Sequence, residues 1–447
     1  MGSIALTLRG ALTNVVREGA SFRRVLADLE SHQNYGQAEI CKHQESALAE
    51  VFRWCRASRF YAAAFPAGDP PPGRALERLA AVTPLEKETL RRRNAEFRAG
   101  GLHGMFAHEG HTSGTTGTPI HCWRDGRAIV FENAALWRVF RWSGLALGDR
   151  RAVLRGDLVV PAARREPPYW ARTAPHLLAL SSYHLAPQNL PLYADALRRF
   201  APAAIQAYPS SAALVASWFV ERGETLPLKA VLTSSETLLD SQRELLEKAF
   251  RAPVIDYYGN AERTAMIARC EKGAYHVMWD YAVTEFLDGE EGGPEIVGTP
   301  LMNRAMPLLR YRSGDRVQHG PVGERCPCGR TFPVCGRPEG RRDVYILTPD
   351  GRRIGRMDHV FKGLEHIREA QIVQTAIDRI VLRIAPDPLF GEEHEKRLVR
   401  QTSERVGADV TVAVEIVEKI PRGPGGKFAA IVSEIGAREP AGSGGAR

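Results

Sequence analysis

The chain has 447 residues, of which 44% are hydrophobic and 25% are charged, a profile typical of a globular protein with two or three domains. The formal net charge is +8, but the basic residues are dispersed, which favours an enzyme with an anionic substrate over a nucleic-acid-binding protein. No apolar run reaches the roughly 18 residues of a membrane span, and the first residues lack the pattern of a secretory signal. We therefore expect a cytoplasmic protein with no nucleic-acid and no membrane partner.

The first 310 residues divide into a helical segment and an alternating segment. Residues 1–100 are expected to be mainly helical, with helical periodicity over 37–53 and 84–97. Strands are expected at 151–155, 203–208, 228–233 and 253–258, and helices at 128–140, 190–200, 211–222 and 240–250. This alternation predicts right-handed βαβ units and a mainly parallel sheet, in which ligands bind beyond the carboxyl ends of the strands.

The last hundred residues have the pattern of a separate α+β unit. Strands are expected at 367–373, 380–385 and 410–417, with a helix over 391–406. Residues 438–447 are rich in Gly, Ser and Arg and are expected to be disordered. The predicted fold is therefore α/β, with a large N-terminal domain of residues 1–337 and a small, mobile α+β domain of residues 338–437.

The most informative motif is the stretch His111-Thr-Ser-Gly-Thr-Thr-Gly-Thr-Pro119. Its glycines allow the backbone to approach an anion closely, and successive N–H groups together with hydroxyls make a concave anion site. It is not a Walker A loop, because no Gly-Lys-Ser/Thr follows. We expect it to hold nucleotide phosphates, the alternative being a mobile surface turn. The contacts would come from Thr112, Ser113, Gly114, Thr115, Thr116, Gly117 and Thr118.

Three further segments follow this motif in order, at 256–262 (DYYGNAE), 306–315 (MPLLRYRSGD) and 421–428 (PRGPGGKF). Together the four resemble the motifs of the adenylate-forming superfamily, which contains acyl-CoA synthetases, adenylation domains and luciferases. The resemblance covers roughly residues 75–430. Within it the chain is most similar to phenylacetate–CoA ligases and their capsule-locus relatives, through the segments 208–211, 233–236, 270–276, 310–315, 326–330 and 336–337.

The resemblance implies a two-step ligase. ATP and a carboxylic acid give an acyl-adenylate and pyrophosphate, and a thiol, usually that of coenzyme A, then displaces AMP. It also implies that the small C-terminal domain rotates between the two steps, with the acidic hinge residue left open between Glu339 and Asp343. Because adenylation joins two anions, it needs positive charge and hydrogen-bond donors placed beforehand.

Individual residues take roles from the same resemblance. Lys427 would act at the α-phosphate and carboxylate, and Glu262 would hold Mg²⁺, which favours carboxylate oxygens. Tyr258 would stack on adenine, and Asp315 would accept hydrogen bonds from the ribose hydroxyls. Further nucleotide contacts would come from Ser234, Ser235, Glu236, Tyr257, Gly259 and Arg337. The competing interpretations are ordinary structural ones: a surface lysine, a solvated loop carboxylate, a core tyrosine, a β-turn aspartate and a cap for the helix after residue 237.

Seven cysteines, an odd number, indicate a reducing environment, and four of them lie between 270 and 335, which suggests a metal instead of disulfides. Three thiols and one imidazole suit tetrahedral Zn²⁺. The predicted ligands of a structural zinc are Cys270, His276, Cys326 and Cys328, with Cys335 as a substitute. The resemblance strengthens this, since similar ligases carry a Cys/His cluster here. The alternative is a set of unligated thiols.

The acid and its acceptor are less constrained. Aromatic residues between 160 and 262 suit an aryl acid, with Tyr183, His184 and Tyr208 as candidate substrate contacts. Coenzyme A is the expected acceptor. The alternatives are a carrier-protein phosphopantetheine, an amine or hydroxyl acceptor, transfer of AMP itself, and a nucleotide-binding sensor without turnover. A homodimer is one option for the assembly.

Overall fold

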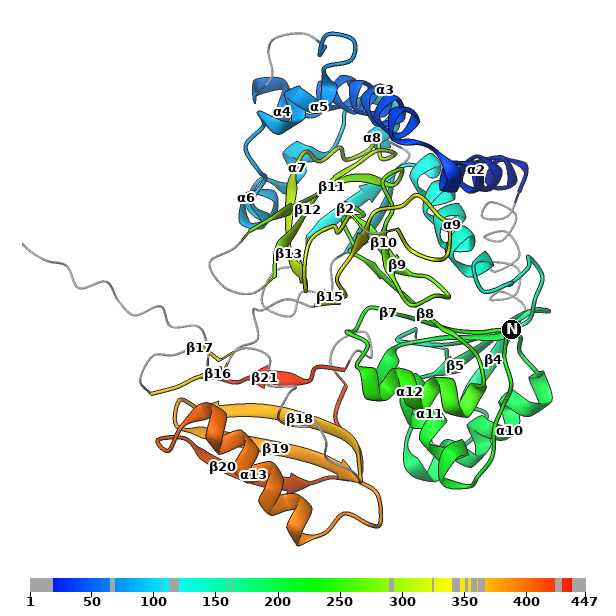
Figure 1. Ribbon diagram of the computed structural model, residues 1–447, viewed down its shortest axis with the longest axis vertical. Helices are drawn as coiled ribbons and strands as arrows, with labels where there is room; N and C mark the ends of the chain where they lie inside the picture. Colours follow the sequence, from blue (N-terminus) through cyan, green and yellow to red (C-terminus); the bar gives the residue numbers. More distant parts are fainter. Residues whose placement is uncertain are drawn as a thin grey trace, which may run out of the picture. The chain divides into compact units, whose positions relative to one another are not determined.

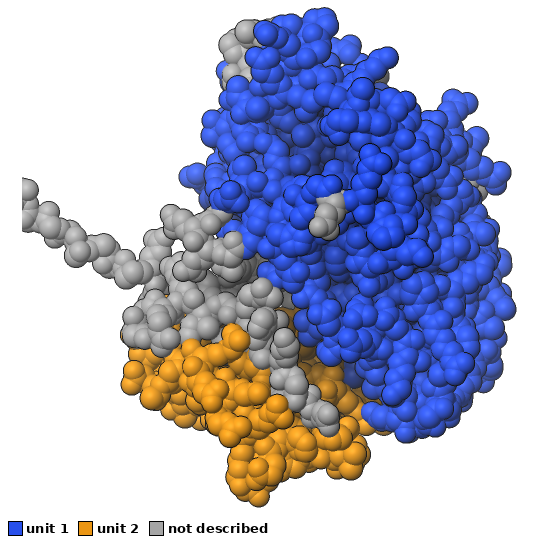
Figure 2. Space-filling view, viewed as in Figure 1, with its two compact units in different colours: residues 1–181, 193–340 blue, residues 182–192, 341–447 orange. Residues whose placement is uncertain are grey.

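The computed structural model describes residues 19–64, 69–105, 107–111, 120–157, 159–161, 164–288, 293–323, 325–339, 346–349, 353–354, 360, 366–422 and 428–435. The chain forms two compact units (Figure 2). The first unit contains residues 1–181 and 193–340, and the second contains residues 182–192 and 341–447. Among the described helices, none combines the length and apolarity needed to cross a bilayer.

The first unit opens with helices, as expected. They are α2 (Ala20–Ser31), η1 (His32–Asn34), α3 (Gln37–Cys55), α4 (Arg59–Ala64), α5 (Ala75–Ala80), α6 (Lys87–Arg92), α7 (Asn94–Phe97) and α8 (Gly101–Met105). The single helix expected over 84–97 is wrong. The backbone leaves the helical region at Arg93 (φ −107°, ψ 22°), and this residue separates α6 from α7.

A nine-stranded sheet forms the core of the first unit, in the order β14-β10-β9-β8-β7-β6-β3-β5-β4. Its strands are β3 (Arg151–Arg155), β4 (Trp170–Ala174), β5 (Leu177–Ser181), β6 (Ala204–Ala207), β7 (Ala230–Ser234), β8 (Val254–Gly259), β9 (Met266–Arg269), β10 (Tyr275–Val277) and β14 (Val334–Cys335). The helices between them are α9 (Gly126–Arg141), η2 (Pro187–Asn189), α10 (Leu190–Phe200), α11 (Pro209–Glu221) and α12 (Asp240–Phe250).

The centre of this sheet, from β5 through β3, β6 and β7 to β8, is parallel. Strand β7 is buried along its whole length, as is usual where helices cover both faces of a parallel sheet. The predicted α/β class is confirmed. The sheet is mixed, however, because β4 at one edge and β9, β10 and β14 at the other run antiparallel to their neighbours.

Two antiparallel elements complete the first unit. A four-stranded sheet contains β11 (Ala282–Leu287), β12 (Glu295–Pro300), β13 (Tyr311–Val317) and β15 (Pro338–Glu339). Burial alternates along β13, so that Tyr311, Ser313, Asp315 and Val317 are buried. A hairpin of β1 (His108–His111) and β2 (His121–Arg124) pairs His111 with His121.

The second unit is an α+β element around one four-stranded sheet. Its order is β20-β19-β18-β21, with an antiparallel pair β18–β19 and parallel pairs at both edges. The elements are β16 (Ile346–Leu347), β17 (Arg353–Ile354), β18 (Ile367–Ala376), β19 (Arg379–Pro386), α13 (Glu392–Val406), β20 (Thr411–Ile416) and β21 (Ile431–Ser433). Helix α13 covers one face of the sheet, with Leu398 in a common core with Ile380 and Leu382 (Figure 1).

Candidate active site

The Ser/Thr/Gly-rich segment 112–119 lies outside the described residues, but the hairpin that carries it is described. Strands β1 and β2 pair up to His111 and His121, so the segment connects the two strands of this hairpin. Arg124, at the end of β2, donates a hydrogen bond from Nη2 to the carbonyl of Ala261 at 2.6 Å. This contact attaches the hairpin to the residue immediately before Glu262.

Two tyrosines connect the segment 257–262 to strand β13, each donating to a carboxylate of the other segment. Tyr258 donates to Oδ2 of Asp315 at 2.8 Å, and Tyr311 donates to Oε1 of Glu262 at 2.6 Å. Burial raises the pKa of Tyr258 well above its usual value, so the phenol stays protonated and remains a donor. The two carboxylates predicted to contact metal and ribose are therefore held in one rigid arrangement.

Glu262 is 5% exposed, and a turn fixes its backbone. Asn260 makes two hydrogen bonds to Thr264 across the turn. Its Nδ2 donates to Thr264 Oγ1 at 2.7 Å, and its Oδ1 accepts from the backbone N–H of Thr264 at 2.9 Å. Gly298 packs closely against this turn. Only glycine fits at this position, because a Cβ there would lie 1.9 Å from the carbonyl oxygen of Thr264. Among the described residues, Oε2 of Glu262 has no hydrogen-bond partner. A buried, unpartnered carboxylate oxygen is costly on its own and fits a hard cation such as Mg²⁺.

Arg155 is a site residue that sequence reasoning missed. It ends strand β3, and its guanidinium donates to Ser235 Oγ at 3.0 Å and to the hydroxyl of Tyr257 at 3.4 Å. The same guanidinium lies 5.6 Å from the ring centroid of Tyr208. Gln206 also donates to the Tyr257 hydroxyl, at 3.0 Å. The carboxyl ends of four neighbouring strands, β3, β6, β7 and β8, thus share one polar network, and the position of Arg155 at a strand end was the available signal.

The segment 234–236 turns sharply at the carboxyl end of β7. Ser235 has a φ of +71°, which is uncommon for a residue with a side chain and typical of functional turns. The carboxylate of Glu236 accepts from the backbone N–H of Ser210 at 3.1 Å and so caps α11. Helix α12 has Leu239 as its N-cap. The alternative that this segment caps the helix after residue 237 is therefore wrong.

Asp256 is a second residue without an assigned role in the sequence analysis. It is buried in β8, and its carboxylate accepts hydrogen bonds from the hydroxyls of Thr233 at 2.6 Å and Tyr275 at 3.0 Å. Burial raises the pKa of Asp256 to about 6, although both hydrogen bonds act in the opposite direction. Asp256 lies on the same strand as Tyr257 and Tyr258, and its two hydrogen bonds connect this strand to β7 and β10.

The four predicted zinc ligands lie together. Their ligand atoms are all within 4.8 Å of one another, with 3.7 Å between the sulfurs of Cys270 and Cys326 and 3.4 Å between Cys328 Sγ and His276 Nε2. A tetrahedral zinc with bonds of about 2.3 Å to sulfur requires sulfur–sulfur distances of about 3.8 Å. His276 Nδ1 lies 3.0 Å from the carbonyl of Phe332, which directs Nε2 toward the thiols.

Cys335, the predicted substitute ligand, is not part of this group. It pairs with Tyr275 between β14 and β10, and burial raises the pKa of its thiol to about 12. Among the described residues, the donor set that fits Zn²⁺ is therefore three cysteines and one histidine. It joins the β9–β10 hairpin to the loop that follows β13.

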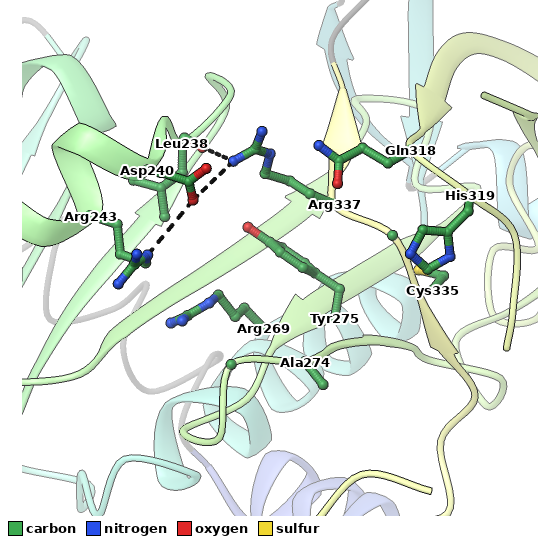
Figure 3. A pocket seen from close by; sticks show the side chains of 12 residues that line it. Leu238, Asp240, Arg243, Arg269, Ala274, Tyr275, Gln318, His319, Cys335 and Arg337 are labelled. Carbon is green, nitrogen blue, oxygen red and sulfur yellow. Dashed lines mark hydrogen bonds and ion pairs between the residues drawn. The ribbon is translucent and has the colours of Figure 1, made fainter. Parts of the chain in front are cut away.

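Arg337 lines a cavity of about 510 Å³ in the first unit. It donates to the carbonyl of Leu238 at 3.3 Å and lies 3.4 Å from Asp240, while Arg243 contacts the same carboxylate from the other side (Figure 3). Arg269 and Tyr275 point into the same space (Figure 3). None of the other described residues predicted to contact the nucleotide lines this cavity. The structure therefore places Arg337 beside Leu238 and the first residue of α12, Asp240.

The remaining predicted residues divide between the units. Lys427, like residues 112–118, lies outside the described residues. Tyr183 and His184 fall in the second unit, and Tyr208 falls in the first. His184 is 9% exposed, and its carbonyl accepts from Asn189 at 2.9 Å.

The chain is similar in sequence and in fold to several known proteins. A family model described as the CapK C-terminal domain matches residues 346–434. Protein CapK of Staphylococcus aureus is 25% identical over 335 residues, which are 72% of this chain and 74% of that protein. The phenylacetate-coenzyme A ligase of Thermus thermophilus is 26% identical over 273 residues, covering 52% of this chain and 60% of the ligase. The indoleacetate–lysine synthetase of Pseudomonas savastanoi is 23% identical over 220 residues, 48% of this chain and 54% of that enzyme.

Solved structures show the same fold. A 2-hydroxyisobutyryl-CoA ligase in the postadenylation state, in complex with R3-HIB-AMP, aligns with a TM-score of 0.67 at 20% identity over 90% of this chain and 91% of the ligase. An anthranilate CoA ligase with anthranoyl-AMP aligns at 0.50 and 14% identity, over 74% and 66% of the two chains. The chain therefore has the fold of these CoA ligases and is similar in sequence to CapK and to the phenylacetate-coenzyme A ligase.

Proposed function

We propose that the protein is an AMP-forming ligase that activates a carboxylic acid as an acyl-adenylate and passes the acyl group to a thiol. The observation that carries the proposal is the pair of crossed tyrosine–carboxylate contacts, which hold Glu262 and Asp315 together. Glu262 also has a buried oxygen without a hydrogen-bond partner among the described residues. It directly follows Ala261, whose carbonyl accepts a hydrogen bond from Arg124 of the β1–β2 hairpin.

In the first step an oxygen of the substrate carboxylate attacks the α-phosphorus of ATP. The bond from the α-phosphorus to the bridging oxygen breaks, and pyrophosphate leaves. Residues 112–118 would donate to the β- and γ-phosphates, Asp315 would accept from the ribose, and Tyr258 would offer its ring to adenine. Lys427 would place positive charge where the two anions meet. Mg²⁺ held by Glu262 would neutralise phosphate charge.

In the second step the thiol sulfur attacks the acyl carbon, and AMP leaves. The names of the related phenylacetate-coenzyme A ligase and the structurally similar acyl-CoA ligases support coenzyme A as the thiol. An amine acceptor is the second candidate, because the chain also matches an indoleacetate–lysine synthetase. The aromatic rings of Tyr208 and Tyr257 around Arg155 favour an aryl or related organic acid.

We further propose that the Cys270–His276–Cys326–Cys328 group holds a structural zinc ion. The donor set leaves no ligand position for substrate, which is the pattern of a structural site. Zinc would fix the loop after β13, and therefore the strand that carries Tyr311 and Asp315.

The deciding experiment is a screen of aryl, fatty, hydroxy and amino acids for acid-dependent pyrophosphate release. Offering coenzyme A, a phosphopantetheinylated carrier protein and amines to the same preparation then identifies the acceptor. We expect release with at least one aryl acid, and loss of release in Lys427→Ala. ATP binding without release for any acid in the screen would refute the ligase function.

A further inference from the structure

A second cavity of the first unit, of about 340 Å³, lies between helix α3, the first turn of α9 and the loop after β12. Most of its wall is apolar, with contributions from Trp54, Leu301 and Met302. Of the described residues predicted to contact nucleotide, acid or metal, none lines this cavity. It therefore shares no described lining residue with the candidate active site.

The loop after β12 is held in place by hydrogen bonds on both sides. Asn303 donates from Nδ2 to the carbonyl of Trp123 at 2.8 Å. The backbone N–H of Arg304 donates to Oδ2 of Asp125 at 3.3 Å. The other oxygen of Asp125 accepts from the first turn of α9 at 2.7 Å and caps that helix. One carboxylate thus joins the loop to α9, and the cavity between them is formed by rigid elements.

Two arginines of the lining, Arg127 and Arg304, carry charge that no acidic side chain neutralises. Within the part of the chain that the structure describes, neither forms an ion pair, and Nε of Arg304 is buried without a hydrogen-bond partner. Glu50 also lines the cavity, but it is paired with Arg53 on the same helix. The lining therefore has an excess of positive charge, which favours an anionic ligand.

His43 supplies a further polar group. Its Nε2 is buried and has no hydrogen-bond partner among the described residues. Burial lowers the pKa of His43, and the neighbouring His32 lowers it further. The imidazole is therefore neutral at pH 7, with a hydrogen on one nitrogen. A buried polar atom without a partner costs free energy, and a polar ligand can remove that cost.

The charged and the apolar parts of the lining adjoin each other. The guanidinium of Arg304 lies 5.4 Å from the ring centroid of Trp54, within the range of a cation–π interaction. Leu301, on the same loop as Arg304, is 1% exposed. A cationic group beside an indole and aliphatic side chains fits a carboxylate on an apolar body better than it fits inorganic phosphate.

We propose that this cavity binds a small organic carboxylate with an apolar body. Arg127 and Arg304 hold the carboxylate. The apolar body contacts Trp54, Leu301 and Met302. A volume of about 340 Å³ is at the lower end of the range for small-molecule pockets, and it suits one aromatic ring with a short side chain. The site goes beyond the proposed function, because binding here needs neither ATP nor turnover.

The test titrates the full-length protein with phenylacetate in the absence of nucleotide. The chain has seven tryptophans, so protein labelled with ¹⁵N-tryptophan gives seven indole signals, and Trp54→Phe identifies the signal of Trp54. We expect this signal to shift with a dissociation constant on the order of 0.1–1 mM. Phenylacetamide lacks the charge and inorganic phosphate lacks the apolar body, so each should bind about tenfold or more weakly.

Two variants remove the cationic groups one at a time. Arg304→Met and Arg127→Met should each weaken phenylacetate binding about tenfold or more. Arg127 is exposed and forms no ion pair with a described residue, so its variant tests the site even if Arg304→Met does not fold. Arg78→Met is the matched control. Its guanidinium lies 5.1 Å from the ring of Phe52 on α3 but does not line the cavity, so its affinity should equal that of wild type.

Each outcome decides a separate part of the proposal. A Trp54 signal that does not shift with up to about 10 mM phenylacetate would overturn the site. Equal affinity for phenylacetamide would overturn the role of the arginines, and equal affinity for phosphate would overturn the apolar body. Arg155→Met should leave the shift intact, and a loss in this variant would assign the signal to the candidate active site. None of these measurements depends on pyrophosphate release, so failure of the proposed function leaves the test valid.

Discussion

The hydroxyl of Tyr311 lies 2.6 Å from Oε1 of Glu262, and this contact joins two segments that are 49 residues apart in the chain. Tyr311 is fully buried, and Glu262 is 5% exposed. The hydrogen bond occupies one carboxylate oxygen, and the other, Oε2, is buried without a hydrogen-bond partner among the described residues.

Tyr311→Phe should therefore weaken metal binding. Losing a hydrogen bond to a charged group costs about 1.5–3 kcal/mol, so the Mg²⁺ concentration for half-maximal pyrophosphate release should rise roughly tenfold or more. Electron paramagnetic resonance of Mn²⁺ binding with nucleotide present gives a readout apart from turnover. Tyr258→Phe is the control, since it disturbs Asp315 and should raise the KM for ATP with the metal dependence unchanged. Equal metal dependence in wild type and Tyr311→Phe would contradict the assignment of Glu262.

Zinc analysis tests the thiol–imidazole group. Protein purified without chelator should contain about one zinc per chain, and Cys328→Ser should lose most of it. Cys335→Ser should retain the metal, because Cys335 lies outside the group. A wild-type preparation free of stoichiometric zinc would show that the four side chains are an unmetallated cluster.

Arg155→Met removes hydrogen bonds to Ser235 and Tyr257 while keeping the aliphatic bulk. We expect an increase in KM for nucleotide or acid equivalent to about 1.5–3 kcal/mol, because hydrogen bonds from a charged donor are lost. Arg172→Met serves as the comparison, since that guanidinium donates to the carbonyl of Pro175 at an exposed position. Steady-state kinetics that are identical for the two variants would exclude a role for Arg155 in the site.

The buried Asp256 predicts a pH dependence of stability. Its pKa is raised from 3.8 to about 6 in the folded state, so the folded protein binds more protons than the unfolded chain between these values. The stabilisation is present below about pH 4 and is lost as pH rises toward 6, a change of about 3 kcal/mol. Asp256→Asn cannot titrate, so its stability relative to wild type should increase across this window and then stay constant. Denaturant unfolding measures the free energy of unfolding of both proteins at each pH. A difference between wild type and Asp256→Asn that stays the same from pH 4 to 7 would contradict this prediction.

A buried ion pair connects the N-terminal helix α2 to the rest of the first unit. Arg138 donates to Oδ1 of Asp280 at 3.0 Å and to the carbonyl of Leu29, with both charged side chains fully buried. Although burial favours the neutral acid, Arg138 and His32 hold the pKa of Asp280 at about 2.

Arg138→Met should cost about 3–5 kcal/mol, because it leaves a buried charge without its partner. Adding Asp280→Leu should recover much of this loss. Arg141→Met is the control, since its pair with Glu30 is exposed and should contribute under about 1 kcal/mol. Chemical denaturation of these three variants and of Asp280→Leu alone measures these differences, and an additive double variant would show that the two residues act independently.

Local pattern was sufficient for much of the fold. The strand 151–155 and the helix 240–250 have the predicted bounds, because their hydrophobic periodicity agrees with their burial. The antiparallel strands β9, β10 and β14 were not predicted, since strands of four, three and two residues show little alternation. Their pairing depends on contacts between segments far apart in the chain.

The candidate site likewise contains residues that could be predicted from the sequence and residues that could not. The Cys/His group was recognisable because its members are chemically distinctive, and the structure brings all four together. The contact of Tyr311 with Glu262 was not recognisable, and the one signal for the network of Arg155 was the position of this residue at a strand end. Arginine and tyrosine are common residues, and their roles arise only when neighbouring strand ends meet.

The crossed contacts of Tyr258 and Tyr311 also constrain how this enzyme could diverge. A shift of either segment displaces Glu262 and Asp315 together, so single replacements at these four positions should be tolerated poorly and joint replacements better. Functional variants selected from libraries randomised at these four positions should therefore carry paired substitutions. Changes in substrate preference should arise at other positions of the molecule.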